Sequence, residues 1–124
     1  MYRSVALCLL LFNSAVAHEM SPTYPKWQLS AMDGVVKTTM ELWNSRKDVQ
    51  YYEIGVFTED FEESVPFVTS YRILKVDFQK LVKFDVYIRK ENIKRAVYIC
   101  SLSKLRSKDV TQTLLATRIC SKFK

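Results

Sequence analysis

The chain of 124 residues contains two glycines, one histidine and three cysteines. With only Gly34 and Gly55, it cannot form a glycine-rich loop that cradles phosphate groups. Its single histidine, His18, stands close to the N-terminus and leaves no positioned imidazole for nucleophilic catalysis. No cluster of cysteine and histidine has zinc-ligand spacing. These absences predict a protein that is not an enzyme and that binds no metal and no cofactor.

Long apolar runs are also missing, and the one short run stands at the start of the chain. Val5–Phe12 is apolar, Arg3 precedes it, and an Ala-Val-Ala motif ends at Ala17. This pattern is typical of a secretory signal peptide that is cleaved between Ala17 and His18. A membrane span needs about 20 apolar residues, so the run is too short to be one. We expect residues 1–17 to be removed and the protein to be secreted and extracellular, without a transmembrane segment. A short buried N-terminal strand is the alternative.

Cysteine usage fits this expectation. Cys8 would leave with the signal peptide, and Cys100 and Cys120 would remain as an even pair in an oxidising compartment. We expect one disulfide between them, which would contribute roughly 3 kcal/mol on the loop-entropy model. Two buried free thiols are the alternative.

The net charge of +6 conceals an uneven distribution. Residues 18–70 contain four Lys/Arg and nine Asp/Glu, whereas residues 71–124 contain fourteen Lys/Arg and four Asp/Glu. The basic second part favours acidic partners such as anionic glycans or lipid. The alternative is a solvated sheet face with ordinary outward lysines and arginines. Residues 59–63 form an acidic cluster, but it lacks the alternating spacing and the glycine of a calcium loop.

Periodicity predicts one helix near the start of the domain. Residues 18–29 contain two prolines and no clear period, which indicates an extended segment. Met32, Val36, Met40 and Trp43 then recur at spacings of four, four and three, which predicts a helix over residues 31–44 with Ser30 as its cap. Residues 51–57 fit either a short strand or a continuation of the helix.

From residue 65 onward the apolar period changes to two. Alternation predicts strands over 67–78 and 82–90, joined by a hairpin turn at 79–81. A turn at 90–94, a strand over 95–102, a loop over 103–109 and a last strand over 111–119 follow. One helix before a run of antiparallel strands predicts an α+β fold.

Several local segments give the chain a resemblance to the secreted (type 2) cystatins. Leu42-Trp43-Asn44 resembles the end of the cystatin helix, and Tyr71–Val76 resembles the strand before its first inhibitory hairpin. Gln79 stands where the Gln-x-Val-x-Gly hairpin motif begins, and Cys100 and Cys120 match the spacing of the C-terminal cystatin disulfide. The resemblance implies a cystatin-like domain over residues 30–124, in which one long N-terminal helix packs on a curved antiparallel β-sheet.

The resemblance also implies a function. Cystatins block papain-like cysteine proteases with an apolar wedge, whose first hairpin corresponds here to Gln79-Lys80-Leu81-Val82-Lys83. Its second hairpin falls on Lys108-Asp109, and no glycine stands before Ser30. Because lysine and aspartate replace glycine and an apolar plug, inhibition is expected to be weak or lost. The implied setting is the reproductive tract. The alternative is a non-inhibitory extracellular or antimicrobial module whose basic half binds anionic surfaces, with no specific nucleic-acid partner.

Overall fold

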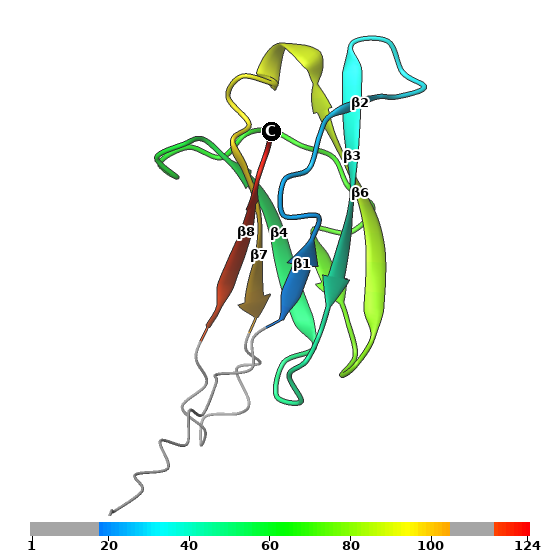
Figure 1. The fold of residues 1–124 in the computed structure, drawn as a ribbon, viewed down its shortest axis with the longest axis vertical. Helices are drawn as coiled ribbons and strands as arrows, with labels where there is room; N and C mark the ends of the chain where they lie inside the picture. Colours follow the sequence, from blue (N-terminus) through cyan, green and yellow to red (C-terminus); the bar gives the residue numbers. More distant parts are fainter. Residues whose placement is uncertain (1–17, 105–115) are drawn as a thin grey trace, which may run out of the picture.

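Two antiparallel β-sheets face each other in the computed structural model, which describes residues 18–104 and 116–124 (Figure 1). These residues contain no α-helix, and the helical turn η1 (Lys90–Asn92) is a 3-10 turn. No described helix has the length and apolar character that a membrane crossing requires. The strands, in chain order, are β1 (Glu19–Ser21), β2 (Gln28–Leu29), β3 (Val35–Trp43), β4 (Tyr51–Phe57), β5 (Ile73–Lys75), β6 (Leu81–Arg89), β7 (Tyr98–Lys104) and β8 (Arg118–Lys122).

The first sheet is built around β3. Strand β6 pairs with β3 along its whole length, from Val35 opposite Arg89 to Trp43 opposite Leu81. On the other side of β3, β1 and β2 share the edge, with β1 beside the end of β3 and β2 beside its start. The N-terminal segment therefore forms one border of this sheet in two short pieces.

The second sheet has the strand order β5-β4-β7-β8, so β5 and β8 are its edge strands. Its register sets Gly55, Cys100 and Cys120 side by side on β4, β7 and β8. Cys100 and Cys120 are joined by a disulfide between adjacent strands. The expected pairing of these cysteines is therefore present in the structure.

The core lies between the two sheets and comes from alternate residues of each long strand. This alternation is the period of two that half-buried strands require. The buried apolar side chains on facing strands include Val36, Met40, Leu42, Tyr52, Ile54, Val56, Phe84, Val86, Ile88 and Ile99.

Asn44 closes one end of this core. Its amide nitrogen donates hydrogen bonds to the carbonyls of Val49 (2.7 Å) and Val76 (2.8 Å). Its side-chain oxygen accepts bonds from the N–H of Arg46 and from the hydroxyl of Tyr52. One buried side chain thus joins the segment before β4 to the segment that follows β5.

The predicted helix over residues 31–44 is wrong, because β3 occupies most of it. Val36 and Met40 are four residues apart, a spacing that puts side chains on one face of a strand as well as of a helix. Only the spacing of three residues from Met40 to Trp43 distinguished a helix from a strand. Trp43 lies on the opposite face of β3 from Met40. Buried Thr38 concealed the alternation, since a threonine on the core face reads as polar. The α+β, cystatin-like fold class is therefore wrong as well.

The two predicted hairpins after residue 65 are also wrong. Strand β5 pairs with β4 in one sheet, whereas β6 pairs with β3 in the other, so residues 79 and 80 cross between sheets. The turn at 90–94 likewise leads from β6 to β7 across the sandwich. Alternation identifies a strand but not its partner, and β3 and β6 pair although two other strands lie between them in sequence. Residues 51–57 form a strand, β4, which is one of the two predicted alternatives.

Candidate functional site

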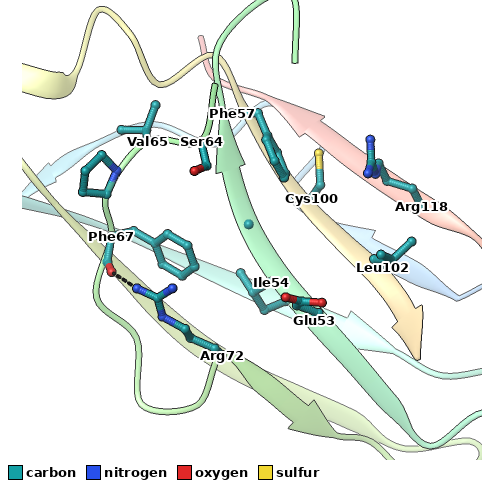
Figure 2. Close-up of a pocket in the computed structure, with 12 residues that line it drawn as sticks. Glu53, Ile54, Phe57, Ser64, Val65, Phe67, Arg72, Cys100, Leu102 and Arg118 are labelled. Carbon is teal, nitrogen blue, oxygen red and sulfur yellow. Dashed lines mark hydrogen bonds between the residues drawn. The ribbon is translucent and has the colours of Figure 1, made fainter. Parts of the chain in front are cut away.

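A cleft of about 450 Å³ opens on the outer face of the second sheet (Figure 2). Its floor is made by outward residues of β4, β7 and β8, including Gly55, Cys100 and Leu102. Its wall is the loop that follows β4, from Ser64 to Phe67, together with Arg72. We call it the arginine cleft, because two guanidinium groups, those of Arg72 and Arg118, line it.

Arg72 lies at the side of the cleft formed by the loop. Its guanidinium carbon is 4.9 Å from the centre of the Phe67 ring, and Nη2 donates a hydrogen bond of 3.5 Å to the Phe67 carbonyl (Figure 2). The backbone of Arg72 is fixed as well, since its carbonyl accepts the N–H of Ile54 on β4. The side chain is thus held at the cleft by an aromatic face and a carbonyl, neither of which neutralises its charge.

Arg118 lies on the β8 side of the cleft. Its guanidinium carbon is 5.6 Å from the centre of the Phe57 ring. Across the sheet, Arg118 stands beside Leu102, which stands beside Glu53. A carboxylate therefore lies in the same row, yet the Glu53 carboxylate is paired with Lys104. The cleft keeps a positive balance because the acid that lines it is already paired with a lysine.

Gly55 makes room for the Phe57 ring. A Cβ atom at Gly55 would lie 2.7 Å from two ring carbons of Phe57, which is closer than side-chain carbons approach. The absence of a side chain therefore lets the ring lie back over β4, where it meets the guanidinium of Arg118. The glycine and the aromatic ring together shape one side of the arginine cleft.

Next to the cleft, β8 has a partly open edge. The N–H of Ser103 bonds the carbonyl of Thr117 and the N–H of Phe123 bonds the carbonyl of Val97, so odd-numbered residues of β8 face β7. Arg118 and Cys120 alternate with them and direct their N–H and C=O groups away from the sheet. Within residues 18–104 and 116–124, no backbone group pairs with these outward groups.

The far half of the same edge is covered. The N–H of Lys122 bonds the carbonyl of Thr23 (3.1 Å), and the N–H of Lys124 bonds the carbonyl of Pro25 (3.1 Å). The N-terminal segment reaches this position after β1, through a cis peptide bond between Ser21 and Pro22. The open part of the edge is therefore short, at residues 118–120, and we call this part the β8 edge.

The residues predicted to contact a protease do not form a wedge. Gln79 and Lys80 lie in the connection that crosses between the sheets, and the N–H of Gln79 bonds the carbonyl of Asn44. Leu81, Val82 and Lys83 are the first residues of β6 and pair with β3. The Lys83 amine lies 3.4 Å from a carboxylate oxygen of Glu41. These residues do not form a hairpin, because the strands on either side of them, β5 and β6, belong to different sheets.

Other predicted site residues have different outcomes. Lys108 and Asp109 lie outside the described residues, as does Ala17 on one side of the predicted cleavage site. His18 is buried, with 1 % of its surface exposed, and its Nε2 lies 2.8 Å from Oγ of Ser101. Burial lowers the pKa of His18, and the nearby charge of Arg46 acts in the same direction. Within the described ranges, no group of three or more potential metal ligands occurs.

The comparisons define the fold. No family model and no curated protein matches the sequence. Among solved structures, the E. coli chaperone DraB matches with a TM-score of 0.66 and 16 % identity, over 86 % of this chain and 53 % of the DraB chain. A chain in the structure of the Salmonella enterica SafA pilin in complex with the SafB chaperone matches with a TM-score of 0.63 and 12 % identity, over 89 % of this chain and 54 % of that chain.

A third match is the ASH / PapD-like domain of human CEP192 (PapD-like domain 7), with a TM-score of 0.54 and 6 % identity, over 86 % of this chain and 81 % of that domain. The chain thus has a PapD-like, immunoglobulin-type β-sandwich fold. It spans about half the length of the two bacterial chains it matches. The predicted cystatin family and its protease-inhibitor function are wrong, because the described residues form a β-sandwich without a long helix and the matched structures are a chaperone, a chaperone–pilin complex and a PapD-like domain. The reproductive setting was implied by the cystatin resemblance alone.

Sequence reasoning did not single out Arg72 or Arg118. The available signal was the excess of lysine and arginine after residue 70. That excess does not identify which cations share a face, because the answer depends on the strand order β5-β4-β7-β8. Arg72 and Arg118 are 46 positions apart and meet only once β7 is placed between β4 and β8.

Proposed function

We propose that this chain is a secreted, non-enzymatic binding domain that takes up an extended segment of another protein along the β8 edge. The observation that carries the proposal is the pair of outward-facing residues, Arg118 and Cys120, whose backbone groups no described residue satisfies. An extended segment placed beside β8 would satisfy these groups and extend the sheet, which is a common mode of peptide recognition.

The similar structures support this proposal. One of the matched structures contains a pilin in complex with its chaperone, so a fold of this kind occurs where one protein holds another. In the same β-sandwich, β8 is an edge strand: β7 pairs with one side of it, and among the described residues the N-terminal segment covers only part of the other side (Figure 1). Secretion is supported by the signal-like start of the sequence and by the disulfide between Cys100 and Cys120, since disulfides persist in oxidising compartments.

A competing interpretation is that β8 is a protected edge. Charged side chains on edge strands discourage pairing with other chains, and Arg118 and Lys122 both project from β8. In that case the open backbone groups would simply be hydrated. The two interpretations differ in whether a peptide with alternating apolar residues binds there.

The first experiment is selection from a displayed library of extended 12-residue peptides, followed by NMR of the full chain with a selected peptide. We expect the amide signals of Arg118 and Cys120 to shift and to become protected from hydrogen exchange. Peptides that shift signals on β6 or on the loop after β4 instead would overturn the proposal, and so would a library without binders.

A pair of variants isolates the backbone contribution. Arg118→Pro removes the outward N–H while leaving the β7 ladder intact, because proline is tolerated on the free side of an edge strand. Arg118→Ala removes the same side chain and keeps the N–H, so it is the matched control. We expect the proline variant to bind a selected peptide about tenfold more weakly than the alanine variant. Equal binding by the two variants would rule out strand addition at this edge.

A further inference from the structure

The two arginines of the cleft differ from the other arginines of the described chain. Residues 18–104 and 116–124 contain five arginines, and three of them form ion pairs. The ion pairs are Arg46–Asp48, Arg89–Glu91 and Arg95–Glu63. Within those same ranges, Arg72 and Arg118 have no carboxylate partner, and both line one cleft. Both unpaired guanidinium groups are thus concentrated in a single hollow.

Each of these guanidinium groups is positioned by the ring beneath it. Arg72 lies over Phe67 and Arg118 lies over Phe57, so their planes are supported while most of their N–H donors remain available. A guanidinium group held in this way loses little conformational freedom on binding a carboxylate, which it can contact with two parallel hydrogen bonds. The cleft is therefore prepared for carboxylates at two separate points.

An apolar side chain and a disulfide lie between the two arginines. Leu102 lies in the row between Arg118 and Glu53, and the disulfide of Cys100 lies in the next row. Glu53 contributes no free charge there, because Lys104 pairs with it. A ligand that fits this arrangement has an anionic group at each end and apolar or neutral groups between them. This chemistry suits a peptide better than a uniformly charged polymer.

The strand order sets the spacing of the two anionic groups. Arg72 lies directly before β5. Three inter-strand steps of about 4.8 Å each separate β5 from β8. An extended peptide advances about 3.3 Å per residue, so roughly four residues cover this distance. Residues four apart also project from the same face of an extended chain, so both acidic side chains can point into the cleft.

From these observations, we propose that the arginine cleft binds an acidic peptide segment, in which two carboxylates four residues apart contact Arg72 and Arg118. The segment crosses the outer face of the second sheet, over Leu102 and the disulfide. This binding is distinct from strand addition at the β8 edge. Arg72 lies next to β5, the edge strand at the other end of the sheet, and side chains rather than backbone groups make the contacts.

The test uses the full chain and three labelled peptides of equal length in a fluorescence anisotropy titration. The first peptide, Glu-Val-Thr-Val-Glu with blocked ends, has the proposed spacing. The second, Glu-Glu-Val-Thr-Val, has the same charge with adjacent acids, and the third replaces both glutamates by glutamine. We expect the first peptide to bind about tenfold more tightly than the second, and the third to bind more weakly than both.

Variants then assign the contacts. Arg72→Gln and Arg118→Gln should each weaken binding of the first peptide by about tenfold and remove its preference over the second. Arg89→Gln is the matched control, because it removes one exposed arginine on β6 and should leave the affinity within about twofold. Arg72→Gln also separates this proposal from the proposed function, since it leaves β8 untouched.

Several outcomes would overturn the proposal. Equal affinity for the two acidic peptides would show general attraction to negative charge rather than a site with defined spacing. Unchanged affinity in both arginine variants would place the peptide elsewhere. Tighter binding of a sulfated oligosaccharide or of vesicles with anionic lipid, lost in the same two variants, would identify the cleft as a site for another class of anion.

Discussion

The hydroxyl of Tyr52 donates a hydrogen bond of 2.5 Å to the side-chain oxygen of Asn44, and both side chains are completely buried. Burial raises the pKa of Tyr52 to about 12, so the hydroxyl keeps its proton at neutral pH. On its other side, Asn44 donates to two carbonyls. This side chain therefore satisfies polar groups of three separate segments in a place that water does not reach.

The Asn44 network yields a stability prediction. Asn44→Asp should lower the free energy of unfolding by about 3 kcal/mol or more, because a carboxyl oxygen would replace the amide nitrogen that faces the carbonyls of Val49 and Val76. Tyr52→Phe removes a single hydrogen bond and should cost about 1 to 2 kcal/mol. Urea denaturation of the two variants measures both losses. A smaller loss for Asn44→Asp than for Tyr52→Phe would contradict the proposed importance of the two carbonyl contacts.

Buried His18 predicts a dependence of stability on pH. Its pKa is lowered in the folded state, mainly by burial and further by Arg46, while a hydrogen bond with Ser101 partly opposes the shift. The unfolded chain therefore binds a proton at higher pH than the folded chain does. Stability should be fully present above about pH 6.5 and should fall as pH decreases from there toward the folded pKa.

The slope in that range can reach about 1.4 kcal/mol per pH unit, the value for one proton. Chemical denaturation at half-unit steps between about pH 7 and pH 5 measures it. The control is His18→Gln, which keeps a polar side chain and removes the titration, so its profile over the same range should be flatter. Identical profiles for the two proteins would show that another group controls the transition.

Gly55 and Phe57 should be energetically coupled. Gly55→Ala should push the Phe57 ring off β4 and destabilise the chain by about 1 to 3 kcal/mol, because the added Cβ overlaps the ring. Phe57→Leu removes the overlapping ring carbons. Gly55→Ala should therefore cost less free energy of unfolding in the Phe57→Leu background than in the native chain. A double-mutant cycle by thermal unfolding measures the coupling, and strictly additive losses would contradict it.

The disulfide predicts a measurable contribution of its own. Cys100 and Cys120 are 20 positions apart, and replacing both by serine should lower the free energy of unfolding by about 3 kcal/mol on the loop-entropy model. Mass spectrometry after alkylation under non-reducing conditions should show no free thiol at either position in the native protein. Alkylation of both cysteines without a reductant would show that the bond is absent.

The alternation of apolar residues was sufficient to locate β6 and β7 to within a few residues, because one face of each strand is buried. It failed at β3, where the spacing of Val36 and Met40 suits both a helix and a strand, and where Thr38 faces the core. A closer weighing of the four β-branched residues between Val35 and Thr39 would have favoured a strand.

The pairing of strands was beyond the reach of periodicity. Each of the two wrong hairpins assumed that neighbours in sequence are neighbours in space, whereas β5 pairs with β4 and β6 pairs with β3. The last two strands, β7 and β8, are neighbours in sequence and do pair. The arginine cleft shares this difficulty, because it depends on which strands separate Arg72 from Arg118. The pairing of Cys100 with Cys120 could be predicted without knowing the strand order, because only two cysteines remain after residue 17 and they can combine in a single way.

The position of Arg118 has a thermodynamic consequence. Its side chain lines the arginine cleft while its backbone belongs to the β8 edge, so one residue borders two surfaces that would hold different segments. A ligand that orders this residue at one surface changes the cost of ordering it for the other. Any such coupling must be reciprocal: the factor by which an acidic peptide alters the affinity for an added strand equals the factor by which the strand alters the affinity for the peptide.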